Sequence, residues 1–145
     1  LIDGSKKMSK SDPNEGSRIN LLDTPEIITK KIKRAKSDSF VGIEFHNQER
    51  AESRNLLMIY SILSGKEISQ CENEFSETGW GTFKKLIAEQ LIESLEPIQE
   101  KYKVLINDPY QLNNILKEGK EKAEYLANKT LIRVKSKLGF LEMEK

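Results

Sequence analysis

In this 145-residue chain, the side chains best suited to binding or catalysis by type and spacing lie in residues 6–14, KKMSKSDPN. Lysines at positions 6, 7 and 10 lie among small hydroxyl side chains, and Asp-Pro-Asn ends the stretch. The stretch is too polar to pack into a core, and it lacks the periodicity of a helix or a strand. It is therefore either a solvated segment without a function or a loop whose ammonium groups bind a ligand of opposite charge.

The charges of the whole chain are unevenly distributed. Residues 1–38 contain nine basic and six acidic residues, residues 39–100 contain five and eleven, and residues 101–145 contain ten and six, for net charges of +3, −6 and +4. Two basic ends around an acidic middle favour a polyanionic partner that contacts both ends. On charge alone, ordinary charge mixing on helical surfaces is the more common explanation.

Composition restricts the location of the protein. A single cysteine, Cys71, excludes an internal disulfide and fits a reducing compartment. No apolar run approaches the roughly 20 residues of a membrane span, and no segment resembles a signal peptide. We therefore expect a cytoplasmic protein that does not contact a membrane. The chain opens at Leu1 and not at methionine, so we expect that the N-terminal part of a larger protein is absent.

Few residues remain for any other active site. The chain has no P-loop and no dinucleotide-binding glycine pattern. His46 is the only histidine, which leaves little material for a histidine-rich metal site or a Ser/His/Asp triad. We expect His46 at the surface or at a helix cap, Cys71 in the core, and no metal ion held by protein side chains.

Hydrophobic periodicity predicts an all-α fold, a bundle of about five helices behind a polar loop at residues 1–20. Pro97 should kink or break the fourth helix, and Gly65 and Gly139 lie where helices end. The predicted helices are one capped by Asp23 and ending near residue 36, then about 48–64, 66–76, 82–103 and 109–138.

The pentapeptide Lys7-Met8-Ser9-Lys10-Ser11 reads KMSKS, the second signature of class I aminoacyl-tRNA synthetases. The chain from KKMSKSDPN through INLLDTPEIITKKIKRAKSDS resembles the bacterial-type tryptophanyl-tRNA synthetases. So do NLLMIYSILSG (55–65), GWGTFK (79–84), EPIQEKY (96–102) and residues 118–140, in the order of that family. NLLMIYSILSG argues against the related tyrosyl family. Segment 40–49 is less typical, and Lys101 stands where arginine is expected.

The resemblance implies ATP, with Mg²⁺, as a substrate. It implies that Lys7 and Lys10 are catalytic and that Lys7, Met8, Ser9, Lys10 and Ser11 bind ATP. The lysines would close over the phosphates as pyrophosphate leaves, so they would favour the transition state over the ground state. Met8 is expected to pack the loop onto the protein body.

The resemblance also implies two domains with different functions. Residues 1–20 would be the end of a catalytic domain, and residues 21–145 a helical C-terminal domain that recognises the tRNA anticodon. An α/β Rossmann-like domain that holds ATP and tryptophan would complete the protein, which would charge tRNA(Trp) as a homodimer. The present chain alone is expected to be inactive, and it could be a monomer. Candidate tRNA contacts are Lys30, Lys33, Arg34, Lys122, Lys129, Arg133 and Lys137, each of which could equally be a plain solvated side chain.

Alternatives remain at this stage. The chain could be a stand-alone helical RNA-binding module with a vestigial loop, or a purely structural bundle. Trp80, between two glycines, is either a core anchor, which we favour, or a platform on which a base stacks. Tyr60, Tyr102 and Tyr125 are expected on packed apolar helix faces.

Overall fold

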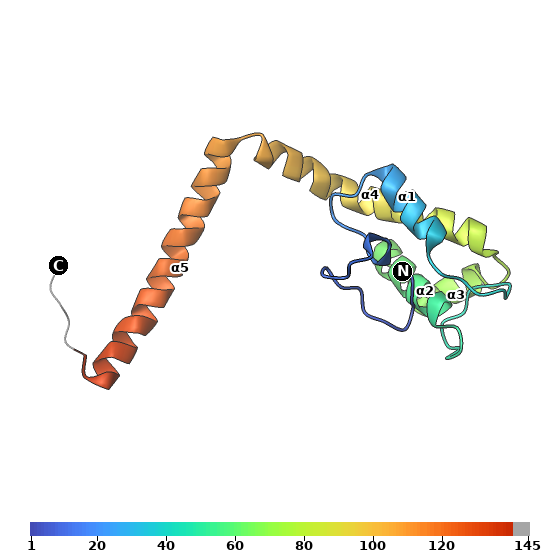
Figure 1. Ribbon diagram of the computed structural model, residues 1–145, viewed down its shortest axis with the longest axis horizontal. Coiled ribbons are helices and arrows are strands. Elements are labelled where there is room, and N and C mark those ends of the chain that lie inside the picture. Colours follow the sequence, from blue (N-terminus) through green and yellow to red (C-terminus); the bar gives the residue numbers. More distant parts are fainter. Residues whose placement is uncertain (141–145) are drawn as a thin grey trace. The chain divides into compact units, whose positions relative to one another are not determined.

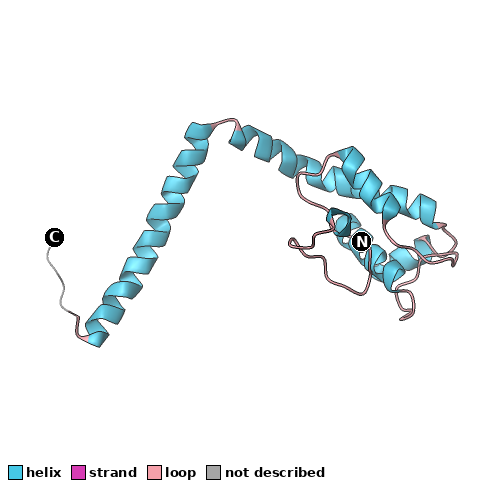
Figure 2. Cartoon of the chain, in the orientation of Figure 1, coloured by secondary structure: helices cyan, strands magenta, loops and turns pink. Residues whose placement is uncertain are grey.

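The computed structural model describes residues 1–140, and its regular elements are helical (Figure 1 and Figure 2). No strand occurs among these residues, and the predicted all-α class with five α-helices is confirmed. The chain divides into two compact units, Leu1–Glu100 and Lys101–Lys145. The elements are a 3-10 helix η1 (Glu15–Ser17), α1 (Pro25–Arg34), α2 (Ala51–Ser64), α3 (Ile68–Glu74), α4 (Trp80–Ile106) and α5 (Pro109–Leu138).

Helix α1 begins one residue later than the sequence suggested. Its N-cap is Thr24, whose hydroxyl accepts a hydrogen bond from the Ile27 amide at 3.4 Å, with Pro25 in the first turn. The prediction of Asp23 as the cap is wrong. The Asp23 carboxylate instead accepts from the Asn20 amide at 2.9 Å and from the Lys31 ammonium at 2.6 Å. It therefore fixes the segment before the helix and not the helix end itself.

The core of the first unit forms where α1, α2, α3 and the first part of α4 turn their apolar faces inward. Three aromatic rings meet at its centre, with ring centroids of Tyr60 and Phe75 4.9 Å apart and those of Phe75 and Phe83 4.7 Å apart. Cys71 is fully buried beside them, as predicted, and burial raises the pKa of its thiol. The other fully buried apolar side chains are Ile28, Ile32, Ile43, Leu56, Leu57 and Ile87.

The irregular segment between α1 and α2 is organised by a buried arginine. The Arg50 side chain is 4% exposed and donates to both carboxylate oxygens of Asp38, at 2.8 and 3.0 Å, and to the Gly42 carbonyl at 2.7 Å. Gly42 has φ +78°, and a Cβ there would collide with the Ser76 carbonyl oxygen. The segment is irregular, as predicted, yet it is held by specific hydrogen bonds.

Helix α4 runs without interruption through Pro97, so a break at this proline does not occur. Within the first unit α4 also holds the segment that leads into α1. The Gln99 side-chain amide donates to the backbone carbonyls of Leu21 at 2.8 Å and Asp23 at 3.0 Å. This contact ties the chain between the polar loop and α1 to a rigid helix.

Helix α5, in the second unit, starts at the predicted cap. Asp108 accepts from the Gln111 amide at 3.0 Å, and Gly139 ends the helix with φ +72°. None of its residues is buried. The expectation of packed tyrosines is correct for Tyr60, which is 7% exposed, and wrong for Tyr102 and Tyr125, which are 45% and 69% exposed.

Candidate functional site

The KMSKS stretch is a polar loop with a defined turn at its end. The Asp12 amide donates to the Ser9 carbonyl at 3.3 Å, and the hydroxyl oxygens of Ser9 and Ser11 lie 3.0 Å apart. The Arg18 guanidinium donates to the Asp12 carbonyl at 2.7 Å. The Ser11 amide donates to the Ser9 hydroxyl oxygen at 3.4 Å, and the Asn14 amide donates to an Asp12 carboxylate oxygen at 2.8 Å. Side chains thus take the place of backbone acceptors here, which favours a turn over a helix or a strand.

Met8 is the apolar member of the loop and packs against the hydrophobic core of the first unit, as expected. Lys7 and Lys10, on either side of it, are exposed. The Met8 thioether side chain therefore helps to attach the loop, while its two signature lysines face solvent. A cavity of about 110 Å³ lies beside this attachment and is lined in part by Lys7, Met8 and Asp12.

The lysines of the loop differ in their partners. Lys6, which precedes the signature, forms an ion pair with Asp3 at 3.2 Å. Hydrogen bonds from Ser5, followed by that from Lys6, lower the pKa of Asp3 to about 2. In the described part of the chain, no carboxylate forms an ion pair with Lys7 or Lys10. Their ammonium groups are thus available to an incoming anion, whereas that of Lys6 is already neutralised.

The candidate tRNA contacts on α1 form one exposed group. Lys30, Lys33 and Arg34 are solvent-exposed, while Lys31, at the border of the apolar stripe, is turned toward Asp23. Burial alone would raise the pKa of Asp23, but the hydrogen bonds from Lys31 and Asn20 outweigh it and lower that pKa. Lys31 is therefore a structural residue, and the other three remain on the surface.

The candidate contacts on α5 form a second exposed group. Lys122, Lys129, Arg133 and Lys137 are all exposed on this helix, in the second unit. Spacings of seven and four residues place them along one side of an α-helix. Each group is thus a basic surface on its own helix.

Sequence reasoning missed a third basic group, at the start of α4. The Lys84 ammonium donates to the Ala35 carbonyl at 2.6 Å and approaches the Ser37 hydroxyl at 3.3 Å, beyond the C-terminal end of α1. Partial burial lowers the pKa of Lys84. Lys85 is its neighbour in the chain. The available signal was the run GWGTFKK, in which two lysines follow an aromatic residue flanked by glycines.

Two remaining expectations concern His46 and Trp80. The His46 side chain is 76% exposed and lies 3.8 Å from a Glu72 carboxylate oxygen, which agrees with a surface position. Trp80 is partly buried and packs against the core. Among residues 1–140, no three histidine, cysteine or acidic side chains gather as metal ligands, and no helix has the length and apolarity to cross a membrane.

Comparison with known proteins connects this loop and these helices to a family. The family model for tRNA synthetases class I (W and Y) matches residues 1–96. A tryptophan–tRNA ligase from Prochlorococcus marinus subsp. pastoris is 77% identical over all 145 residues, which span 43% of that protein. The chloroplastic/mitochondrial tryptophan–tRNA ligase of Arabidopsis thaliana is 49% identical over 98% of this chain and 35% of that protein.

A solved structure agrees with these relatives. The crystal structure of tryptophanyl-tRNA synthetase from Mycoplasma pneumoniae superposes with a TM-score of 0.84 at 31% identity, over 97% of this chain and 43% of that one. The chain thus spans about two fifths of the length of the first curated relative that it matches. Its signature loop, its helical fold and the match across residues 1–96 all lead to one assignment: this chain belongs to the class I tRNA synthetases of the W and Y family.

Proposed function

We propose that this chain supplies the phosphate-binding loop and the tRNA-binding helices of a tryptophan–tRNA ligase. The activity of such a ligase has two steps: tryptophan and ATP form tryptophanyl-adenylate, and the adenylate then transfers tryptophan to tRNA(Trp). The observation that carries the proposal is the pair of exposed lysines, Lys7 and Lys10, without carboxylate partners among the described residues, on a loop attached through Met8. The names of the relatives support the choice of tryptophan.

The role of the lysines follows from where charge moves. The carboxylate oxygen of tryptophan attacks the α-phosphorus of ATP, and the bond from that phosphorus to the bridging oxygen of pyrophosphate breaks. Negative charge then accumulates on the leaving pyrophosphate. Ammonium groups at its oxygens interact more strongly with the transition state than with intact ATP, so they raise kcat. ATP arrives with Mg²⁺ as a substrate complex, and the Ser9 and Ser11 hydroxyls add hydrogen-bond donors for phosphate oxygens.

Substitution of one signature lysine tests this role. In the full-length protein, Lys10→Ala should lower kcat for adenylate formation about 10²–10³-fold, the loss typical of removing one charge-stabilising donor. The KM for tryptophan should stay close to that of the unmodified protein, because the lysine contacts the phosphates and not the amino acid. Pyrophosphate exchange measures both quantities.

Lys6→Ala is the matched control, because Lys6 belongs to the same loop but already pairs with Asp3. It should retain most of the activity. An equal loss of kcat and tryptophan affinity in Lys10→Ala, accompanied by a lower unfolding temperature, would mean that the loop acts through folding and would contradict the proposal.

The helices would supply the tRNA-binding part of this function. Lys30, Lys33 and Arg34 on α1 and the basic side of α5 present exposed cations that suit a phosphate backbone. Binding through such contacts weakens as salt rises, because each neutralised phosphate releases condensed counterions.

A further inference from the structure

The segment that leads into the KMSKS loop lies on the first turn of α2. The Leu1 side chain is 5% exposed and belongs to the core, and the Leu1 carbonyl accepts a hydrogen bond from the Lys36 amide at 3.0 Å. A Cβ at Gly4 would lie 2.6 Å from the Ala51 carbonyl oxygen, so the backbone of Gly4 is in direct contact with α2. Helix α2 is itself held in the core by buried side chains. The loop therefore starts from a fixed point.

One carboxylate, that of Glu52 in the first turn of α2, joins these contacts. Its side chain is 13% exposed, and it accepts hydrogen bonds from the Lys36 ammonium at 2.8 Å and from the Gly4 backbone amide. The hydrogen bond from Lys36 is the main cause that lowers the pKa of Glu52, and burial opposes it only in part. The positive end of the helix dipole also favours a carboxylate at this position. Glu52 is therefore charged at neutral pH and holds Gly4 on α2.

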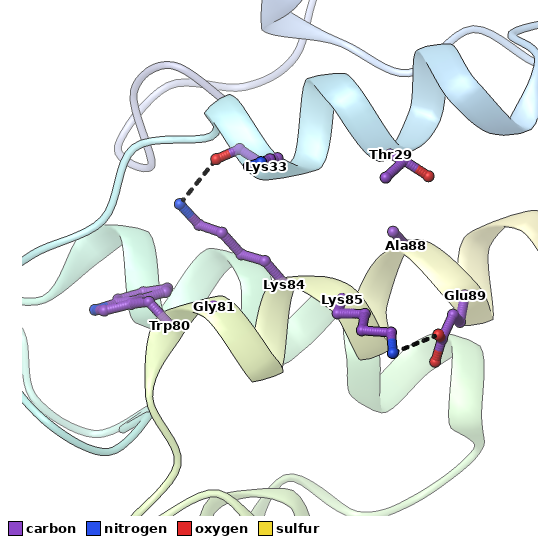
Figure 3. A pocket seen from close by; sticks show the side chains of 8 residues that line it. All are labelled: Thr29, Lys33, Trp80, Gly81, Lys84, Lys85, Ala88 and Glu89. Atoms are coloured by element: carbon purple, nitrogen blue, oxygen red, sulfur yellow. Dashed lines mark hydrogen bonds and ion pairs between the residues drawn. The ribbon is translucent and has the colours of Figure 1, made fainter.

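The partner of Glu52 is held from α4 (Figure 3). The Lys84 ammonium lies at the wall of a cleft of about 470 Å³ between α1 and the first turns of α4, and it donates to the carbonyls of Ala35 at 2.6 Å and Lys33 at 3.4 Å. Ala35 directly precedes Lys36 in the chain. The backbone that carries the Lys36 ammonium is thus fixed on both sides, by Lys84 and by Leu1.

A tight turn connects Gly4 to the signature lysines. The Asp3 carboxylate accepts from the Ser5 amide at 3.0 Å and from the Ser5 hydroxyl at 2.6 Å, and the Lys6 amide donates to the Asp3 carbonyl at 3.3 Å. These bonds restrict the backbone torsions between Gly4 and Lys7. A displacement of Gly4 is therefore passed on to Lys7 and is not absorbed by the turn.

We propose that Glu52 is a positioning residue for the phosphate-binding loop. By holding Gly4 against α2, it sets the point from which Lys7 reaches the phosphates, and it acts without contacting ATP. This inference rests on the proposed function, in which Lys7 interacts with the leaving pyrophosphate. The competing explanation is an ion pair with Lys36 that stabilises the fold and has no effect on the loop. The two explanations predict different kinetics.

Alanine at position 52 removes both contacts of the carboxylate. In the full-length protein, Glu52→Ala should lower kcat for adenylate formation about tenfold or more, because a misplacement of about 1 Å can cost a factor on the order of 10². The KM for tryptophan should stay unchanged, because the loop contacts the phosphates. Pyrophosphate exchange measures both quantities, and circular dichroism checks that each variant is folded at the assay temperature.

Two further substitutions separate positioning from stability. Glu74 pairs with Lys66 and has no contact with the loop segment, so Glu74→Ala removes an ion pair from the same unit and should keep its kcat. Glu52→Gln keeps an oxygen that can accept from the Gly4 amide and should retain most of the activity. If Glu52→Ala behaves like Glu74→Ala, or if alanine and glutamine at position 52 cause equal losses, the assigned role of the Gly4 contact is overturned.

A pair of glycine substitutions tests the same contact from the side of the loop. A Cβ at Gly4 collides with the Ala51 carbonyl, whereas a Cβ at Gly79 meets no atom within 4 Å. Gly4→Ala should therefore lift the segment from α2 and lower kcat about tenfold or more. Gly79→Ala should leave kcat unchanged. Equal kcat values in the two folded variants would contradict the proposal.

A double substitution tests whether Glu52 acts through Lys7. In a protein that already carries Lys7→Ala, the further change Glu52→Ala should lower kcat by a clearly smaller factor than it does in the unmodified protein, because a group that Glu52 positions is already gone. Factors that simply multiply would mean that Glu52 acts independently of Lys7, and they would overturn the proposal.

The outcomes also separate this inference from the function on which it rests. If Lys7→Ala and Lys10→Ala both retain full activity, the proposed role of the loop fails, and the role of Glu52 fails with it. If the lysine substitutions abolish adenylate formation while Glu52→Ala and Gly4→Ala match their controls, the role of Glu52 fails and that of the lysines stands.

Discussion

Asp38 shows how one carboxylate can organise several parts of the helical unit. It accepts two hydrogen bonds from Arg50, one from the Trp80 indole and one from the Phe40 amide. Burial by itself would raise the pKa of Asp38, but the hydrogen bonds from Arg50 and Trp80 outweigh it and lower that pKa. The charged form is therefore the one that the fold stabilises.

The lowered pKa of Asp38 predicts a pH-dependent contribution to stability. A carboxylate whose pKa is lower when folded stabilises the fold fully above its unfolded pKa of about 4, and the contribution disappears as pH falls through the folded pKa. Asp38→Asn should cost about 2 kcal/mol of unfolding free energy at pH 7, the scale of a hydrogen bond to a charged group. Urea unfolding at pH 7 and at successively lower pH measures this difference between the two proteins.

The difference should shrink as the pH falls below 4, because the reference protein then also carries a neutral side chain at position 38. Other carboxylates with lowered pKa values, Asp23 and Glu52 among them, titrate in both proteins and cancel in the comparison. A gap that stays constant down to the acid limit would contradict an electrostatic origin.

The burial of a side chain was predictable where one physical requirement determines its position. Met8 had to bury its side chain, and Cys71 fell on an apolar helix face. Asp23 and Thr24 were different, since either adjacent side chain could cap α1. The choice depended on Lys31, about two helical turns further along, whose ammonium donates to the Asp23 carboxylate. Such a pairing requires three-dimensional knowledge of which lysine turns inward.

At the scale of an element, the N-terminus of α1 offers a simple experiment. Thr24→Ala should destabilise the protein by about 1 kcal/mol, because the Ile27 amide loses its capping oxygen. Thr24→Ser keeps the oxygen and should change the unfolding free energy far less. Chemical denaturation gives both values. If alanine and serine prove equivalent, the Thr24 hydroxyl does not cap the helix.

Helix ends were predictable from residues that typically start or stop helices. Gly65, with φ +69°, ends α2, and Asp108 with Pro109 starts α5 as expected. Pro97 was less decisive, because a proline removes one helical hydrogen bond without necessarily ending a helix. The cleft lined by Thr29 and Lys33 of α1 and by Lys84 of α4 could not be predicted from the sequence. Thr29 and Lys33 are some 50 residues from Lys84 in sequence, and hydrophobic periodicity does not indicate which helices lie side by side.

At the scale of the whole molecule, the proposed function would require a second site that binds the rest of ATP and tryptophan. The resemblance places that site in a domain with a His-Ile-Gly-His type of signature, whereas this chain has a single histidine, His46. We therefore predict that the 145-residue chain alone shows pyrophosphate exchange no faster than the uncatalysed background. Tryptophan-dependent exchange above that background would contradict the prediction.

The family could be predicted from short motifs in order, and the comparisons confirm it across the chain. The division at residues 20 and 21 stays a prediction. Residues 1–20 share a compact unit with the helices that follow, because Met8 and Ile19 pack against the same core as α1 and α2. Their assignment to a catalytic domain came from the resemblance and not from a change in composition.

The Gln99 amide group has a mechanical consequence. Its nitrogen donates to the carbonyl oxygens of both Leu21 and Asp23, so two hydrogen bonds connect the segment before α1 to α4. That stretch cannot slide along the helix without breaking both attachments. We therefore expect residues 21–23 to move together with this part of α4.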